Sequence, residues 1–267
     1  MEAALRAVNL LAADSLLEGR LAQACGAGRW ARLLWRCGAA VWNGLEAGRR
    51  PSNHYLADLL GLLWLGAAFG GRGAAARWTA FARDEIPRVL LRQTEPDGGW
   101  DEASLPYHGL ATEMALAAAV AVPGLLSGAA ARRLDAMVAI VCDFTRADGS
   151  IVAFGDEDGG RVWPLDRFCA GGRGASLAAL AGVVLGRTFA PRPTAFCPRS
   201  GWWAARCGGH AAWMEFGGTG MNGWGSHAHN DDLSVCCDWN GGPLLDDPGS
   251  HIYTGDPAAR NRLPLPE

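Results

Sequence analysis

The sequence predicts a multidomain protein in which a helical part precedes a β part. From Ala3 to about Phe189, apolar residues recur at intervals of three and four, which is the period of an amphipathic helix. After the proline-rich segment 188–201 the pattern changes to strict alternation, which is the period of a half-buried strand. We therefore expect a helical domain over residues 1–190 and an antiparallel β domain over residues 191–267.

The helical part divides into segments separated by breaks rich in Gly, Pro and Asp. Consecutive amphipathic helices joined by short turns pack antiparallel and bury their apolar faces on one another, so the expected structural unit is a helix hairpin. The predicted helices span 3–18, 28–46, 54–70, 73–93, 107–122, 129–146 and 174–188.

The β part contains two predicted hairpins. In segment 233–239 four residues fall on one face of a strand: Leu233, Val235, Cys237 and Trp239. The Asn-Gly-Gly that follows suits a tight turn, and 243–247 returns as the partner strand, while 201–218 forms the other hairpin. So few hairpins would leave open sheet edges, so we expect the chain to be truncated at its C-terminal end.

The bulk composition excludes several classes of partner. The formal net charge of −3 and the pI near 6.1 give no broad basic field, so a nucleic acid is not expected to bind. No apolar stretch is long enough to cross a membrane, and no signal peptide is visible. The eight cysteines contain no C-x-x-C pair, which favours free thiols over a disulfide scaffold or a zinc ribbon.

The segment "GSHAHNDDLSV" (225–235) concentrates titratable side chains just before a predicted strand. In an extended chain His227, His229 and Asp231 point to the same side. Such a set suits a metal site or an acid/base site, and Asp247 could supply another ligand. A solvated polar loop is the alternative.

Two predicted helices begin with polar side chains that could be functional. In "RRPSNHY" Ser52 or Asn53 can cap the helix, and His54 lies in its first turn. Free N–H groups and positive partial charge at such an end, together with an amide and an imidazole, could hold a carboxylate. Tyr107 and His108 occupy the equivalent position after the loop "EPDGGWDEASLP". The alternatives are a simple cap at Asn53 and a Tyr107 that only covers the core.

The acidic turn "FGDEDGGRV" (154–162) offers Asp156, Asp158 and Arg161. It lacks the spacing of an EF-hand calcium loop. We interpret it as a turn braced by an Asp–Arg pair.

Taken together and in this order, these segments resemble the heparinase II/III-like family of polysaccharide lyases, to which some alginate lyases are also similar. "MEAALRAVNLL" resembles the family's Glu-x-x-x-Arg-x-x-Asn helix, "SNHYLADLLGLLWLG" its Asn-His-Tyr helix start, "ASLPYH" its Tyr-His segment and "GDEDGGR" its acidic turn. The most specific likeness is "HAHNDDLSV…DDPGSHIYTGD…RN", which resembles the signature of the family's β domain.

The resemblance implies an N-terminal (α/α) toroid followed by an antiparallel β-sandwich, and β-elimination at a uronic acid of an acidic polysaccharide. It implies that Asn53 and His54 neutralise the uronate carboxylate and that Tyr107 transfers protons at C5 and at the glycosidic oxygen. It also implies that His227 assists as base or orients the sugar. Three further residues become candidates for substrate contact: His108, Tyr253 and Arg260.

The resemblance also implies no cofactor for the chemistry itself, and a structural zinc in some members with His229 and Asp247 among its ligands. This chain ends at "RNRLPLPE", before the further histidine that often supplies the third ligand. It also begins within what resembles a helix of the middle of the toroid, so early helices and an export signal are expected to precede it. The family implies a periplasmic or secreted protein.

Two other functions fit the sequence. A glycoside hydrolase on a helical toroid would need two facing carboxylates, for which Asp101, Glu102, Asp156 and Asp158 are available. A glycan-binding protein or inactive remnant would instead stack sugars on Trp100, Trp224 and Trp239. The sequence leaves the polymer open among heparan sulfate, chondroitin-type glycans, alginate and bacterial exopolysaccharides.

Overall fold

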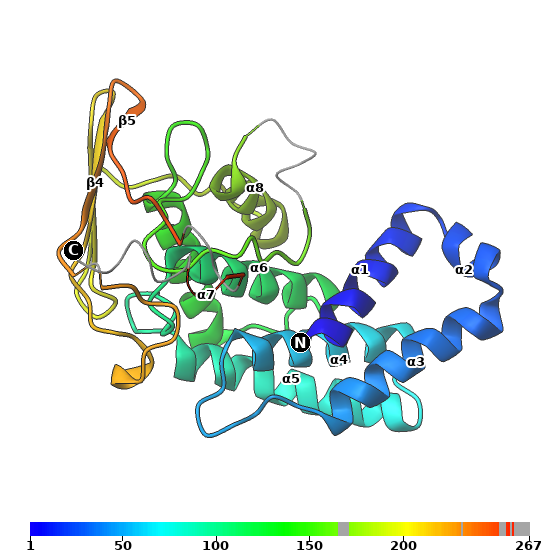
Figure 1. The fold of residues 1–267 in the computed structure, drawn as a ribbon. Helices are drawn as coiled ribbons and strands as arrows, with labels where there is room; N and C mark the ends of the chain where they lie inside the picture. Colours follow the sequence, from blue (N-terminus) through cyan, green and yellow to red (C-terminus); the bar gives the residue numbers. More distant parts are fainter. Residues whose placement is uncertain (165–170, 231, 251–254, 257, 259–267) are drawn as a thin grey trace. The chain divides into compact units, whose positions relative to one another are not determined.

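The computed structural model describes residues 1–164, 171–230, 232–250, 255–256 and 258. Within these residues eight α-helices precede a five-stranded antiparallel sheet, which confirms the predicted α-then-β class (Figure 1). None of the helices in the described part is long and apolar enough to cross a membrane.

The helices lie within a few residues of the predicted ranges. Only the short α2 has no predicted counterpart. They are α1 (Glu2–Leu16), α2 (Arg20–Cys25), α3 (Ala27–Asn43), α4 (Asn53–Ala68), α5 (Ala74–Gln93), α6 (Leu105–Ala121), α7 (Gly128–Asp143) and α8 (Arg173–Leu185).

The described chain forms two compact units that do not follow the change from helix to strand. The first unit consists of residues 1–93, 111–134 and 162–164. The second unit consists of residues 94–110, 135–161 and 165 onward. The domain division near residue 190 stays a prediction.

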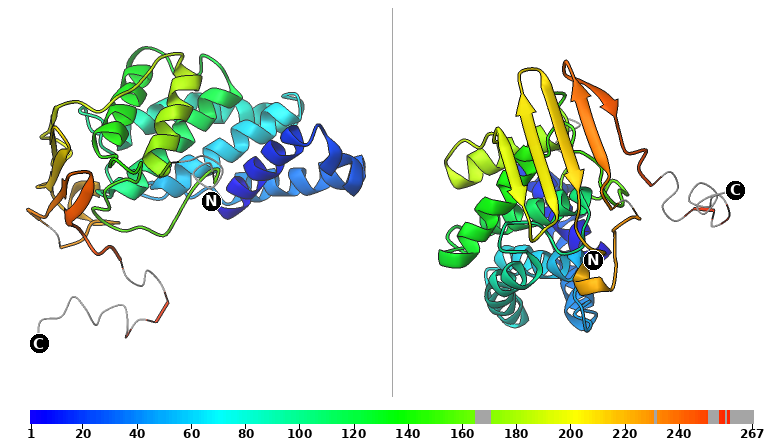
Figure 2. Two further views of the ribbon diagram at one scale, coloured as in Figure 1. Left: turned by 90° about the horizontal axis from the view of Figure 1, so that it is seen from above. Right: turned by 90° about the vertical axis from the view of Figure 1, so that its left-hand side faces the viewer.

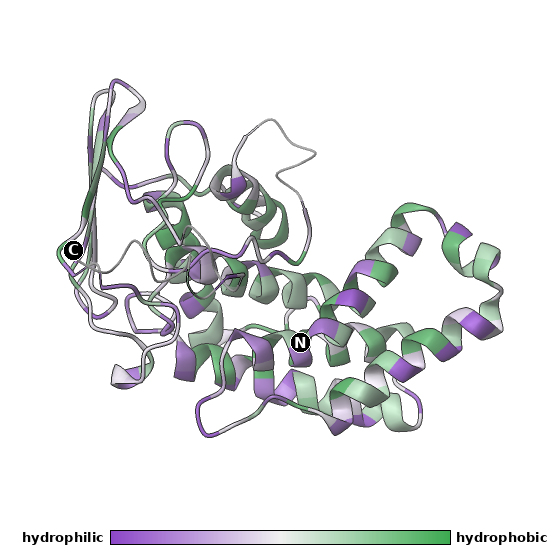
Figure 3. Cartoon of the chain, in the orientation of Figure 1, coloured by the Kyte–Doolittle hydropathy of each residue, from purple (hydrophilic) through white to green (hydrophobic). Residues whose placement is uncertain are grey.

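Helix α4 forms the core of the first unit and contacts α1, α3 and α5. It carries leucines on nearly every side, and most of them are fully buried. Its neighbour α3 is amphipathic, as Figure 3 shows, with Trp30, Leu34, Cys37 and Val41 buried at helical spacing. Helix α1 approaches so closely that a Cβ on Gly61 would lie 2.6 Å from the Cβ of Ala4. The helices of this unit therefore pack by the apolar periodicity that the sequence displays.

The sheet belongs to the second unit and is a simple meander in the order β1-β2-β3-β4-β5 (Figure 2). Its strands are β1 (Thr194–Cys197), β2 (Trp202–Cys207), β3 (His210–Glu215), β4 (Val235–Trp239) and β5 (Gly242–Leu245). Both predicted hairpins are present, and Asn240 and Gly241 take the positive φ values of 49° and 80° that the β4–β5 turn requires. Strand β1 falls in a segment that we predicted to be a break.

The inner face of the sheet packs on helix ends and on the turn that follows α7. Its central side chains are Trp202 and Trp213, both almost fully buried. They belong to one apolar cluster with Leu105 at the start of α6 and with Phe144 and Phe154. The segments 104–108 and 154–158 are thereby fixed beside the sheet.

Strand β4 is half-buried, as its alternating pattern predicts. The face that carries Val235 and Trp239 is the open one, since Val235 is 39% exposed and Trp239 is 60% exposed. The buried face carries Cys236 and Asp238. Asp238 is accommodated because it forms an ion pair with Arg146, whose guanidinium lies 5.2 Å from the centre of the Trp213 ring.

Candidate active site

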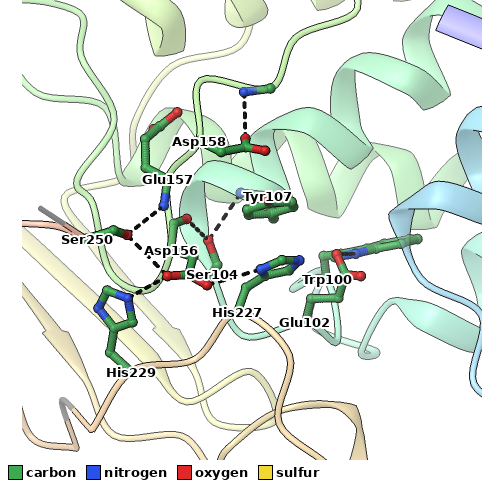
Figure 4. A network of polar contacts seen from close by, with 11 residues as sticks. Trp100, Glu102, Ser104, Tyr107, Asp156, Glu157, Asp158, His227, His229 and Ser250 are labelled. Carbon is green, nitrogen blue, oxygen red and sulfur yellow. Dashed lines mark hydrogen bonds and ion pairs between the residues drawn. The ribbon is translucent and has the colours of Figure 1, made fainter. Parts of the chain in front are cut away.

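Three segments of the second unit bring polar side chains together (Figure 4). The start of α6 supplies Tyr107, the turn 154–158 supplies Asp156, and the loop before β4 supplies His227 and His229. The rings of Tyr107 and His227 stack with 3.6 Å between their centroids and 9° between their planes. Two of the predicted catalytic residues, 120 positions apart in the chain, are therefore in direct contact.

Ser104 fixes the position of Tyr107. Its hydroxyl oxygen accepts a hydrogen bond from the backbone N–H of Tyr107 at 3.2 Å, which caps the first turn of α6. The same hydroxyl donates to the carbonyl oxygen of Asp156 at 2.8 Å. One serine thus anchors the helix start and ties it to the acidic turn.

Gly155 allows this turn to lie close to its neighbours. It has φ of +78°, and an added Cβ would lie 2.7 Å from the carbonyl oxygen of His227 and 2.8 Å from the Cβ of Ser104. Only glycine fits both the conformation and the space. The backbone N–H of Asp156 donates to the carbonyl oxygen of His227 at 2.8 Å, so the turn and the histidine loop are joined at the main chain.

The carboxylate of Asp156 contacts three side chains. Its Oδ2 lies 3.3 Å from Nδ1 of His227, and its Oδ1 lies 2.9 Å from Nε2 of His229 and 3.2 Å from the hydroxyl of Ser250. Burial raises the pKa of Asp156, but the hydrogen bonds from His227 and His229 lower it by more, so its net pKa lies well below the usual value. Asp156 is therefore ionised at neutral pH.

The acidic turn was predicted to be braced by an Asp–Arg pair. In the structure Nη1 of Arg161 donates to the carbonyl oxygen of Gly159 at 2.6 Å, and Asp158 accepts from the backbone N–H of Gly160 at 2.8 Å. Asp156 points instead to the histidines. The contact of Asp156 with the two histidines is the main feature of the candidate site that the sequence did not predict.

His108 lies in the interior and is 1% exposed. Its Nδ1 accepts from the backbone N–H of Trp100 at 3.2 Å, and its Nε2 lies 3.0 Å from the carbonyl oxygen of Met137. Burial lowers the pKa of His108 to about 4, although the bond to Met137 opposes this. These contacts give His108 an architectural task within the second unit.

Asn53 and His54 belong to the first unit, at the start of α4. Ser52 is the residue that caps this helix, because its hydroxyl accepts from the backbone N–H of His54 at 3.3 Å. Asn53 is 1% exposed, and Nδ1 of His54 lies 2.7 Å from Oε2 of Glu46. Of the two predicted caps, Ser52 is therefore the one that the structure shows.

In the described part of the chain, the two predicted zinc ligands have other partners. Nε2 of His229 is hydrogen-bonded to Asp156, and Oδ1 of Asp247 accepts from the backbone N–H of Gly249 at 2.7 Å. No group of three His, Cys, Asp or Glu side chains in the described part of the chain could hold a metal ion. Tyr253 and Arg260, and also Asp231, lie outside the described residues.

The fold is that of heparinase-like polysaccharide lyases. The chain matches the crystal structure of a heparinase III with a TM-score of 0.68 and 15% identity, over 87% of this chain and 40% of that one. It matches a heparinase III gene product with a TM-score of 0.64 and 19% identity, over 83% and 36% of the two chains. The heparan sulfate lyase HepC from Pedobacter heparinus gives a TM-score of 0.62 and 18% identity, over 87% and 38%.

These likenesses establish the fold alone, since all the identities lie below 20%. The chain spans 35% to 40% of the length of the structures it matches. No protein-family model matches the chain, and no curated protein matches it in sequence.

Proposed function

We propose that this chain is the catalytic part of a polysaccharide lyase that cleaves a uronic-acid-containing glycan by β-elimination. The observation that carries the proposal is the stacked pair of Tyr107 and His227, held beside an ionised Asp156. The heparinase-like fold supports it.

The pair supplies the two proton transfers that the elimination needs. A base removes the proton at C5 of the uronate, the C5–H electrons form the C4=C5 double bond, and the bond from C4 to the glycosidic oxygen breaks. The departing oxygen must then receive a proton. We assign these transfers to Tyr107 and His227, with the imidazole assisting as base and the phenol serving the departing oxygen.

Removal of the C5 proton places a second negative charge on the uronate group, so the enolate-like state must be stabilised. An amide and an imidazolium can do this without a metal. Asn53 and His54 enter the proposal for this task through the family resemblance alone. Each is tested by its own alanine variant, which should lower kcat more than it raises KM if the interaction forms mainly in the transition state.

The names of the similar structures support a ranking of the candidate substrates. One of them carries the name heparan sulfate lyase, so heparan sulfate leads the candidates, followed by chondroitin-type glycans, alginate and bacterial exopolysaccharides. Since such polymers lie mainly outside cells, we propose that the protein acts in the periplasm or after secretion.

The two competing functions receive less support. The hydrolase needs a pair of open carboxylates, but Glu102 is fully buried and accepts from Nε1 of Trp100 at 2.8 Å, and Asp156 is engaged by two histidines. The glycan-binding alternative invoked Trp100, which is 2% exposed and has no face to offer a sugar. Trp224 and Trp239 are exposed and stay compatible with sugar binding.

The test is the ultraviolet absorbance of the unsaturated uronate formed at each cut, because elimination creates this conjugated group and hydrolysis does not. The purified protein is incubated with the polymer panel beside Tyr107→Phe. We expect absorbance to rise on at least one polymer and the variant to lose about 100-fold or more of the rate.

The matched control is Tyr55→Phe, which removes the same hydroxyl from a buried tyrosine of the first unit. It should keep the wild-type rate. Reducing ends released without the chromophore would show hydrolysis, and a Tyr107→Phe variant as active as the control would contradict the assignment of Tyr107.

A further inference from the structure

We propose that Asp156 is the positioning residue of this site and that it determines which nitrogen of His227 acts in the elimination. This inference rests on the proposed function, and it names a residue to which the sequence assigned no part in the elimination.

The carboxylate of Asp156 contacts the imidazole ring of His227. Oδ2 of Asp156 lies 3.3 Å from Nδ1 of His227, at the long end of the hydrogen-bond range. A carboxylate only accepts hydrogen bonds, so Nδ1 must carry the proton in this contact. In the neutral ring the lone pair then lies on Nε2, on the edge that points away from Asp156 in Figure 4.

Asp156 also holds His227 through a hydrogen bond between the main chains of the two residues. The backbone N–H of Asp156 donates to the carbonyl oxygen of His227 at 2.8 Å, and the ring stacks on Tyr107 with 9° between the planes. The imidazole is thus held on one side by Tyr107 and at Nδ1 by Asp156, and these contacts fix the orientation of the ring.

The carboxylate of Asp156 is itself held in place by two further side chains. Its other oxygen, Oδ1, contacts Nε2 of His229 at 2.9 Å and the hydroxyl of Ser250 at 3.2 Å. These contacts prevent the carboxylate from rotating, so Oδ2 stays directed at His227. His229 therefore takes part through Asp156.

The kinetic experiment compares Asp156→Asn with Asp158→Asn on the most reactive polymer. The control changes the same residue type in the same turn, and its carboxylate accepts from the backbone of Gly160 instead of from a histidine. We expect kcat of Asp156→Asn to fall by about 100-fold with KM little changed, and Asp158→Asn to stay near wild type. Equal losses in both variants, or a rise in KM alone, would overturn the inference.

A double-mutant cycle separates positioning from a general structural role. If Asp156 acts through His227, then Asp156→Asn should cost little in rate once His227→Ala is already present. If Asp156 only holds the turn together, the losses should multiply, and the inference would be wrong.

The closing experiment does not depend on activity. Two-bond ¹H–¹⁵N correlation spectra of the imidazoles, taken at a single pH at which His227 is neutral, report which nitrogen carries the proton. We expect His227 of the wild-type protein to carry it on Nδ1, and Asp156→Asn to weaken that preference.

A wild-type ring protonated on Nε2 would overturn the positioning of His227 even if the lyase is active. A ring protonated on Nδ1 in a protein inactive on every polymer would uphold the positioning and remove the proposed function. The assignment on the wild-type protein decides the question even if Asp156→Asn fails to fold.

Discussion

Two histidines of the second unit differ in what surrounds their rings. The side chain of His227 is 14% exposed and lies between a phenol and a carboxylate. His108 is buried against backbone groups, and both its nitrogens serve the main chain. The same residue type therefore serves the proposed chemistry at one position and the architecture at the other.

The burial of His108 predicts a pH dependence of stability. Its pKa is about 4 in the folded protein and about 6.5 in the unfolded chain, so between these values only the unfolded chain binds the proton. The part of the free energy of unfolding that depends on a neutral His108 is fully present above pH 6.5. It is lost as the pH falls towards 4, and its total is about 3 kcal/mol.

The measurement is urea unfolding at several pH values across this range. The control is His108→Gln, which keeps a donor and an acceptor but has no titrating ring. We expect the free energy of unfolding of the variant to vary less over this range. An identical pH dependence in both proteins would show that other groups cause it.

At the scale of elements, the helices and the hairpins follow from local pattern. Apolar spacing and Gly, Pro and Asp breaks located seven helices, and the Asn-Gly-Gly turn located the β4–β5 hairpin. Strand β1 was not predicted, because prolines surround it in the sequence. It forms by pairing with β2, and no local pattern indicates that pairing. The burial of Asp238 depends on Arg146, 92 residues earlier, so no local pattern could indicate it.

The candidate site could also be predicted only in part, because some of its contacts join residues that lie far apart in the chain. Tyr107 and His227 became candidates because polar groups stand where a helix and a strand begin, and the family resemblance gave them catalytic roles. The proposed role of Asp156 depends on its contacts with His227 and His229, which lie 71 and 73 positions later in the chain. The segment around Asp156 itself has the composition of an ordinary turn. The only local signal was the density of acids and glycines in "GDEDGG".

Gly155 and Gly159 provide a matched prediction for this turn. Their φ values are +78° and +76°, so alanine is strained at both positions. An added Cβ at Gly155 would collide with the backbone of His227 and with Ser104, whereas at Gly159 it would meet only the tip of Arg161 at 3.5 Å.

We expect Gly159→Ala to cost about 1 kcal/mol in the free energy of unfolding. Gly155→Ala should cost on the order of 2 kcal/mol more and should also lower the lyase rate, since it displaces the His227 loop. Urea unfolding and the absorbance assay measure the two effects. Equal values for the two variants would mean that the backbone at 155 can shift freely.

At the scale of the whole molecule, the outer face of the sheet carries several exposed apolar side chains. Phe196, Trp203, Met214 and Val235 are cross-strand neighbours in one row over four strands. Phe196 is 64% exposed, and Trp239 on the same face is 60% exposed. Contiguous exposed patches of this kind promote association, unlike single exposed apolar residues.

We therefore expect the purified protein to bind hydrophobic dyes and to associate as its concentration rises. Phe196→Ser combined with Trp239→Thr should reduce both effects and change the free energy of unfolding by less than about 1 kcal/mol. The control pair, Leu16→Ser with Val183→Thr, removes exposed apolar residues that belong to two helices and not to the sheet, and it should leave both effects unchanged. Dye fluorescence and sedimentation provide the measurement, and equal effects of the two pairs would contradict the role of the patch.

The meander order of the sheet has a consequence for synthesis on the ribosome. Each strand pairs with the strand made just before it, and the inner face rests on Leu105, Phe144 and Phe154, which are made earlier still. Strands can therefore be added one at a time to a surface that already exists, without waiting for a distant partner. The order of translation can therefore serve as the order of assembly in this sheet, and the loop that brings His227 to Tyr107 then joins its partners after β1, β2 and β3 have been made.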